Sequence, residues 1–393
     1  MRIAMRCGHA TGKILKALLL AVVPIALVIP GGEVAISQTG TATVTQAPVF
    51  TAIDLNPNGF VESWALGTSD GEQVGFGCCP VGGDLLHALL WRGNAASAVD
   101  LTPPGFTNSQ AYGTCGGQQV GFGAGPVTGN HSHALLWHGS AASAVNLHPR
   151  GLEGSEARAT SCNEQVGRGF TAQSGDADHA LLWRGSASSV ADLFPGKRFG
   201  AIALGVSGGQ QVGNVNGHAL LWRGSSDSAV DLHPKGFEYS EASGNFGGQQ
   251  VGWGSIRGHH HALLWRGSAG SVVDLNPLAF TTSEALGTCG GQQVGRGYGP
   301  ATRNAIHALL WQGSADSVVD LHAFLPSGFT HSQALHIDAA GDVVGSASTT
   351  PGPPGTLGRW ATWDSPLNSN SHAILWKRNL PEPGISREQN MRC

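Results

Sequence analysis

Short apolar stretches recur along the chain in a fixed order, with Gly, Ser, Pro or Asn between them. The most regular stretch is H-A-L-L-W, in which one polar residue opens a run of four apolar residues. It occurs six times, and a seventh copy reads H-A-I-L-W. The residues that bound the copies are His87, His133, His179, His218, His261, His307 and His372, with Trp91, Trp137, Trp183, Trp222, Trp265, Trp311 and Trp376. Runs of this length between turn-forming residues are typical of β-strands.

Three further blocks accompany each copy. An S-x-A-x-G block and then a G-Q-Q-V-G-like block precede H-A-L-L-W, and G-S-A-x-S-x-V with a following D-L or N-L pair comes after six of the seven copies. Four short strands in a period of about 45 residues are the size of one propeller blade. We therefore expect an all-β fold, a seven-bladed β-propeller. The small S-x-A-x-G block suits the innermost strand, and the bulky H-A-L-L-W block suits a middle strand that packs between blades.

The two ends of the repeat region predict how the ring closes. A D-L pair at Asp54-Leu55 precedes the first complete repeat, whereas the last repeat lacks the G-S-A-x-S-x-V block. If residues 49–55 supply the outer strand of the seventh blade, the ring is closed and no open strand edge is left there. A six-bladed or eight-bladed ring, or another array of stacked sheets, is the alternative.

The N-terminal region has the pattern of an export signal. Four basic residues precede an apolar run over 17–29, which is too short to span a bilayer comfortably, and a small-x-small cleavage site ends at Ser37. We predict a signal peptide over 1–37, a linker over 38–48, a propeller over 49–378 and a C-terminal tail over 379–393. The expected location is extracellular, or periplasmic if the protein is retained. An uncleaved membrane anchor is the alternative reading of the first segment.

Composition narrows the classes of partner. Only 12% of the residues are charged, but 41% are apolar and eleven are Trp, so the chain has enough material for a packed core and is not disordered. The net charge is −4, and no basic run follows the N-terminus. We therefore expect no nucleic-acid partner, no membrane contact beyond the export signal, no cofactor and a monomeric protein.

The cysteines match no metal-binding or redox spacing. Six of the seven lie after the predicted signal, and Cys115, Cys162 and Cys289 occupy equivalent hairpin positions in different repeats. Because the Cα atoms of a disulfide must approach within about 7 Å, we expect Cys115 and Cys162 to lie too far apart to bond.

The repeated H-A-L-L-W core, followed by a Gly-rich turn and a D-L block, resembles the bacterial extracellular HAF-repeat family. The resemblance covers most of the chain, although Leu or Ile stands here where the family has Phe. It implies export and a repeat architecture, but no activity, ligand or catalytic residue.

The repeated His and Asp residues invite a metal or catalytic interpretation. Equivalent residues in a ring of blades lie far apart, however, and one zinc ion needs three or four nearby ligands. We expect the His to form hydrogen bonds with the repeat Ser or Asp, and we predict no catalytic residue and no metal site. The G-x-G strings of the second block are interpreted as glycines that only bound β-strands. A polar ring is a further hypothesis, built on the residues that follow the repeat Ser: Glu156, Glu241, Glu284, Gln110 and Gln333.

The largest interruption of the repeat lies between Val344 and His372. It contains Trp360, Trp363 and Asp364, which we take as candidate ligand contacts because long loops beside a ring opening often bind ligands. A lid that packs its own Trp onto the propeller is the alternative. The sequence as a whole favours a non-catalytic scaffold that binds a glycan, a protein or a surface component. The alternative is a propeller-type glycoside hydrolase or lyase with its site over the central channel.

Overall fold

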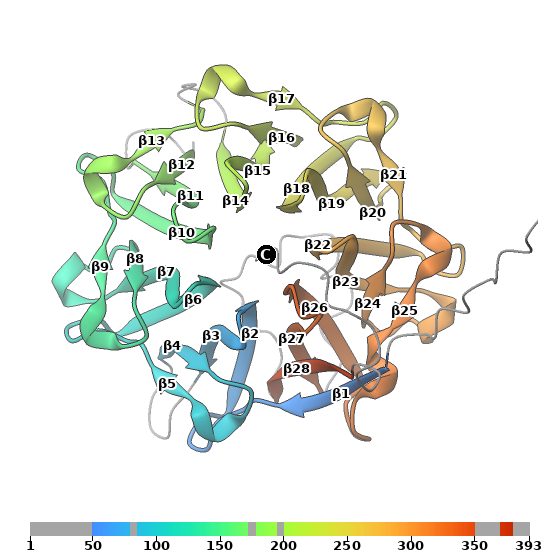
Figure 1. Cartoon of the computed structure of the whole chain (residues 1–393), viewed down its shortest axis with the longest axis horizontal. Coiled ribbons are helices and arrows are strands. Elements are labelled where there is room, and N and C mark those ends of the chain that lie inside the picture. Colours follow the sequence, from blue (N-terminus) through green and yellow to red (C-terminus); the bar gives the residue numbers. More distant parts are fainter. Residues whose placement is uncertain (1–48, 79–84, 172–177, 195–199, 350–369, 380–393) are drawn as a thin grey trace, which may run out of the picture. The chain divides into compact units, whose positions relative to one another are not determined.

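The computed structural model describes residues 49–78, 85–171, 178–194, 200–349 and 370–379. These residues form seven four-stranded antiparallel sheets, which lie around a common axis like the blades of a propeller (Figure 1). The predicted seven-bladed β-propeller is therefore confirmed. Among the described residues, no helix has the length and apolar character needed to cross a membrane.

Each blade has the same four strand positions from the axis outwards (Figure 1). The innermost strands of blades 1 to 7 are β2 (Glu62–Ser69), β6 (Asn108–Cys115), β10 (Gly154–Thr160), β14 (Ala201–Ser207), β18 (Tyr239–Phe246), β22 (Thr282–Cys289) and β26 (His331–Ile337). The second strands are β3 (Glu72–Cys78), β7 (Gln118–Ala124), β11 (Gln165–Phe170), β15 (Gln210–Val215), β19 (Gln249–Ile256), β23 (Gln292–Tyr298) and β27 (Val343–Ser348). The third strands are β4 (Leu86–Trp91), β8 (His133–Trp137), β12 (His179–Trp183), β16 (His218–Trp222), β20 (His259–Trp265), β24 (His307–Trp311) and β28 (Ser371–Asn379).

The outer strands are short in six blades and long in the seventh. They are β5 (Val99–Asp100), β9 (Val145–Asn146), β13 (Ala191–Asp192), β17 (Val230–Asp231), β21 (Val273–Asp274), β25 (Val319–Asp320) and, in blade 7, β1 (Val49–Asp54). Strand β1 pairs with β28 along its whole length, from Val49 opposite Asn379 to Asp54 opposite Ile374. The predicted closure of the ring by the N-terminal strand is confirmed.

The prediction that G-S-A-x-S-x-V forms a strand is only partly right. Its first half forms a 3₁₀ turn in six blades: η1 (Ala95–Ser97), η3 (Ala141–Ser143), η4 (Ala187–Ser189), η5 (Ser226–Ser228), η6 (Ala269–Ser271) and η8 (Ala315–Ser317). In blade 1 the Ser97 hydroxyl accepts from the Arg92 amide at 2.7 Å and donates to the Asn94 carbonyl at 2.6 Å. Such local side-chain bonds favour a turn over a strand. Three further 3₁₀ turns are η2 (Pro126–Thr128), η7 (Pro300–Thr302) and η9 (Leu321–Phe324).

The repeat tryptophans fill the spaces between neighbouring blades. All seven are fully buried. Trp137 of blade 2, for example, packs in one cluster with Val74, Leu90 and Leu101 of blade 1. Burying one large apolar side chain stabilises a fold by roughly 1.5–3 kcal/mol, so these clusters hold each blade against the next.

Hydrogen bonds between blades explain why the Ser of the S-x-A-x-G block recurs along the chain. The Ser109 hydroxyl of blade 2 accepts from the Ala88 amide of blade 1 at 2.9 Å. The same bond joins Ser63 of blade 1 to Ala373 of blade 7 at 3.0 Å, across the closure of the ring. In this way a fully buried backbone amide without a partner on a neighbouring strand still forms a hydrogen bond. The free-energy cost of leaving the amide unpaired is thereby avoided.

The repeat histidines bond to the repeat aspartates, as the sequence analysis expects. The Nδ1–H of His87 donates to Asp100 at 2.6 Å, and that of His372 donates to Asp54 of β1 at 2.6 Å. Equivalent pairs occur in every other blade except blade 2, where Asn146 replaces the aspartate. These contacts tie the third strand to the outer strand. Among the described residues, no group of three or more His, Cys, Asp or Glu side chains is placed to hold a metal ion.

The expectation that Cys115 and Cys162 are too far apart to bond is wrong. They form a disulfide with a Cα–Cα distance of 5.0 Å. Cys115 ends the inner strand of blade 2, and Cys162 lies two residues beyond the inner strand of blade 3. Because inner strands converge on the axis, hairpins there approach one another far more closely than at the rim. The blade alignment that placed the two cysteines at equivalent hairpins is unaffected. Cys78 and Cys289 are disulfide-bonded as well.

We expect Asn146→Asp to make blade 2 less sensitive to acid. The His133 ring stacks on His148 with centroids 3.9 Å apart, and burial, followed by the charges of His148 and His131, lowers the pKa of His133 to about 4. A lowered histidine pKa contributes stability above pH 6.5, and this stability is lost as the pH falls toward 4. An aspartate at 146 favours the protonated ring, so the pKa of His133 should rise and the loss should shrink.

Nuclear magnetic resonance titration of His133 and thermal unfolding at pH 7 and pH 5 test this prediction. The matched control is Asp231→Asn in blade 4, where His218 stacks on His233 with centroids 4.0 Å apart. That exchange removes the carboxylate from the pair and should make unfolding more sensitive to acid, the opposite effect. An unchanged His133 titration in Asn146→Asp contradicts the prediction.

Candidate binding site in the central channel

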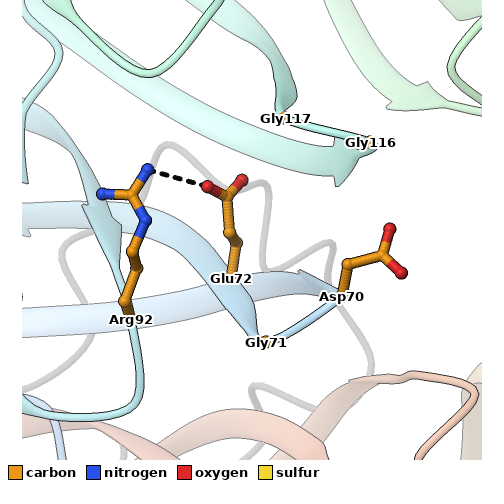
Figure 2. Close-up of a pocket in the computed structure, with 6 residues that line it drawn as sticks. All are labelled: Asp70, Gly71, Glu72, Arg92, Gly116 and Gly117. Carbon is orange, nitrogen blue, oxygen red and sulfur yellow. Dashed lines mark hydrogen bonds and ion pairs between the residues drawn. The ribbon is translucent and has the colours of Figure 1, made fainter.

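A surface hollow between blades 1 and 2 belongs to the repeat architecture. It measures about 450 Å³ and is lined by Asp70, Gly71, Glu72, Arg92, Gly116 and Gly117 (Figure 2). The Glu72 carboxylate pairs with Arg92 at 2.8 Å and accepts from Gln119 of blade 2 at 3.1 Å. The same arrangement joins Glu164 to Arg184 and to Gln211 of the next blade. Since these polar groups already bind one another, the hollow is explained as a junction between blades.

A second hollow lies in the central channel and has a different origin. It measures about 180 Å³ and is lined mainly by the seven inner strands. Every inner strand contains a β-bulge, an extra residue without a partner on the second strand. The seven bulge residues, all of which line the cavity, are Leu66, Tyr112, Arg158, Leu204, Ser243, Leu286 and Leu335. Bulges redirect side chains, and here they turn one side chain per blade toward the axis.

The ring of bulge residues is chemically uneven. Four members are Leu, and the other three are Tyr112, Arg158 and Ser243. The Arg158 guanidinium lies over the Tyr112 ring, 4.4 Å from its centroid, and its Nη2 pairs with Glu156. The Arg158 side chain is only 6% exposed, yet its Nε and Nη1 atoms have no hydrogen-bond partner among the described residues. Burial of such a charged group lowers the stability of the fold unless its remaining N–H groups find hydrogen-bond acceptors.

Two buried carboxylates beside the channel are held by arginines. Glu156 accepts from Arg168 at 3.0 and 3.1 Å in addition to Arg158. Glu284 accepts from Arg296 at 2.8 Å and from His260 at 2.7 Å. Burial alone raises the pKa of each carboxyl, but the adjacent guanidinium charges outweigh it and hold the pKa of both below the ordinary value. Both groups are therefore ionised and already paired at neutral pH.

Glu241 is the carboxyl that lines the cavity without an arginine partner among the described residues. It accepts from Trp253 Nε1 at 3.3 Å and from the Tyr239 hydroxyl at 3.5 Å. Its burial, followed by the charge of Glu284, raises the pKa of Glu241 to about 7. A carboxyl with this pKa exchanges its proton near neutral pH.

The hypothesised polar ring is present but interrupted. Glu156, Glu241, Glu284, Gln110 and Gln333 are all buried at equivalent inner-strand positions. Gln333 accepts from Arg296 at 2.8 Å, which links blades 6 and 7. The equivalent positions in blades 1 and 4 hold Trp64 and Ile202, so the polar groups gather on blades 2, 3, 5, 6 and 7.

An aromatic and aliphatic cluster forms the wall on the other side. It contains Trp64, Leu66, Phe76, Tyr112, Phe122 and Leu335, from blades 1, 2 and 7. Trp64 and Phe76 stack with centroids 4.7 Å apart. The channel is thus apolar toward these blades and charged toward blades 3, 5 and 6.

Sequence reasoning missed the residues of the second strands that face this region. The residue after the first glycine of V-G-x-G (V-G-N-V in blade 4) is Phe76, Phe122, Arg168, Asn214, Trp253 and Arg296 in blades 1 to 6. The first glycine is fixed by packing: a Cβ on Gly167 would lie 1.9 Å from the Glu156 carbonyl oxygen, and one on Gly252 would lie 1.8 Å from that of Glu241. The detectable signal is a variable residue that follows an invariant glycine. Interpretation of the G-x-G strings as glycines that only bound strands overlooks it.

The candidate loop residues Trp360, Trp363 and Asp364 lie outside the described residues. Their proposed role in ligand contact stays a prediction. The repeat His and Trp residues are all described and lie in the third strands, away from the bulge residues that line the cavity.

Comparisons with known proteins extend to the fold alone. No protein-family model matches the chain, and no curated protein matches it. The β-propeller domain of the trilobed protease from Pyrococcus furiosus is 10% identical with a TM-score of 0.52, covering 81% of this chain and 93% of that one. An oligogalacturonate lyase in complex with manganese is 10% identical with a TM-score of 0.50, covering 85% and 97%.

A mutant puromycin hydrolase gives a further match, 12% identical with a TM-score of 0.50 over 73% of this chain. The chain spans about half the length of that enzyme. At these identities the matches support a β-propeller scaffold, and function must be argued from the channel itself.

Proposed function

We propose that the protein is an exported, non-catalytic β-propeller that binds a small ligand in its central channel. The observation that carries the proposal is the cavity ringed by bulge residues, one of which, Arg158, has two nitrogen atoms without a hydrogen-bond partner among the described residues. Pockets that combine an apolar wall with a few convergent polar groups are the usual form of ligand sites. Membership of the HAF-repeat family, which implies export, remains part of this proposal.

Export is supported by the cysteines as well as by the N-terminal pattern. Cys115 and Cys162 are joined across two blades, and Cys78 and Cys289 are also oxidised. Stable disulfides are typical of proteins outside the cytoplasm.

Binding is favoured over catalysis by the state of the carboxylates. Glycoside hydrolysis requires two carboxyl groups that act on one bond. Of the described residues that line the cavity, Glu241 is the only carboxyl, while Glu156 and Glu284 are engaged by arginines. The second candidate function is a glycoside hydrolase or lyase, and it has one specific observation in its favour. Burial gives Glu241 a pKa of about 7, which suits a general acid or base.

A channel-filling variant tests the proposed function. Ser243→Phe places an aromatic ring where the bulge points into the cavity, so it should abolish ligand binding, whereas Ser243→Ala removes one hydroxyl contact and should weaken binding far less. The measurement is a thermal-shift screen of both variants and the unchanged protein with sugars, sugar acids, amino acids and short peptides. Compounds that stabilise the unchanged protein and Ser243→Ala, but not Ser243→Phe, support the channel site.

Two outcomes contradict the proposal. Compounds that stabilise Ser243→Phe equally bind elsewhere on the protein. Turnover of a polysaccharide by the unchanged protein, lost in Glu241→Gln, would establish the hydrolase or lyase instead.

A further inference from the structure

Residues that line the cavity carry a specific set of donors and acceptors without partners among the described residues. Arg158 offers N–H donors at Nε and Nη1, while the Asn245 Oδ1 atom is a buried acceptor without a partner among the described residues. Ser243 Oγ is also without a partner there and can donate or accept. All three residues line the cavity. A complementary ligand therefore needs an acceptor group for Arg158 and separate donor groups for Asn245.

His336 of blade 7 adds a second acceptor. It lines the cavity, its Nδ1 has no partner among the described residues, and its ring bonds to the Thr68 backbone. Burial lowers the pKa of His336 to about 4, so the ring is neutral at pH 7. A neutral ring that donates through one nitrogen to a carbonyl accepts through the other. The residues named here thus contribute to the cavity lining one cationic donor group, two acceptors and one hydroxyl that have no partner among the described residues.

We propose that the channel cavity binds a small hydroxylated carboxylate, such as a sugar acid, whose carboxylate meets Arg158 and whose hydroxyls meet Asn245, Ser243 and His336. This inference rests on the proposed function and names the chemical class of its ligand. The carbon skeleton would lie against the leucines of the bulge ring. A cavity of about 180 Å³ suits a single small molecule.

The charges around the cavity favour a singly charged anion. Arg168 is shared between Glu156 and Asp178, and Arg296 between Glu284 and Gln333. Among the described residues that line the cavity, Arg158 is therefore the cation with N–H groups left to bind a ligand. Guanidinium groups bind carboxylates through charge-assisted hydrogen bonds, which are about twice as strong as neutral ones.

Ligand binding should be coupled to protonation of the Glu241 carboxyl. The groups that face it are Trp253, Tyr239, Glu284 and Arg158. Its pKa of about 7 leaves it roughly half ionised at pH 7. A carboxylate that enters beside it raises this pKa further, because like charges disfavour one another. Binding should therefore be accompanied by uptake of up to about half a proton at pH 7 and should weaken as the pH rises from 6 to 8.

Isothermal titration calorimetry of the full chain tests the inference with matched pairs of probes. Glucuronate is compared with glucose, galacturonate with galactose, and gluconate with sorbitol. We expect at least one acid to bind about tenfold or more tightly than its neutral partner, since a hydrogen bond to a charged group contributes roughly 1.5–3 kcal/mol. Titration in two buffers of different ionisation enthalpy measures the proton uptake without any variant.

Two variants then assign the roles. Arg158→Gln should remove the preference for the acid, and its unfolding curve checks that it folds, as expected because Arg168 still pairs with Glu156. Glu241→Gln should bind without proton uptake. Equal affinity for acid and neutral sugar, no binding by any of the three acids, or unchanged affinity in Arg158→Gln overturns the inference. The proposed function fails separately, through the Ser243→Phe comparison.

Discussion

Deletion of residues 49–55 is expected to leave the protein insoluble. The deletion removes all of β1, so the nine-residue strand β28 keeps β27 but loses its outer partner and becomes an open edge. It also removes Phe50 and Leu55, which are buried in two separate core clusters, and the bond between Asp54 and His372. Unpaired edges beside exposed apolar surface promote pairing between chains. Blade 7 joins strands from both ends of the described ring in one sheet, so its failure opens the propeller.

Fractionation of expressed protein and sedimentation of any soluble material measure this effect. Two single substitutions in this segment serve for comparison with the deletion. Leu55→Ala keeps the strand but creates a cavity, which should lower the free energy of unfolding by about 2–5 kcal/mol. Thr51→Ala changes an exposed side chain of the same strand and should behave as the unchanged protein. A soluble deletion variant that unfolds at an unchanged temperature would refute closure by β1.

Replacement of Cys115 and Cys162 by serine is expected to lower the free energy of unfolding by about 4 kcal/mol. The disulfide joins residues 47 positions apart, and restraint of a loop of that length in the unfolded chain accounts for this magnitude. The bond also fastens the inner hairpins of blades 2 and 3 beside the channel. The double variant should therefore unfold earlier in denaturant, with that part of the ring opening first.

Peptide mapping under non-reducing conditions checks the pairing, and denaturant unfolding measures the loss. Ser161→Ala, next to the bridge, is the control and should change stability little. A Cys115-containing peptide released without reductant would disprove the bridge. Equal unfolding midpoints for the double variant and the unchanged protein would contradict the stated contribution.

The sequence predicted the scaffold because the scaffold is set by short-range patterns that recur. Seven copies of the apolar blocks fix the strands, and each His and Asp of the repeat lie close together in every blade that has both. The two ends of the repeat region also predicted the closure, since the outer strand missing after Trp376 is supplied by the segment that ends in the D-L pair at Asp54. Repetition makes such inferences strong, because each blade must bury the same faces against identical neighbours.

The channel was decided by the tertiary structure. Arg158 was not singled out, because strict alternation along a strand gives no sign that a bulge turns it toward the axis. The proximity of Cys115 and Cys162, and the shared environment of Glu241, Glu284 and Arg158, arise from convergence of inner strands that are distant in sequence. The sequence by itself thus determined a closed ring of seven equivalent blades. Only the tertiary structure decided which side chains meet at the centre, because that depends on the summed twist and bulge geometry of seven strands at once.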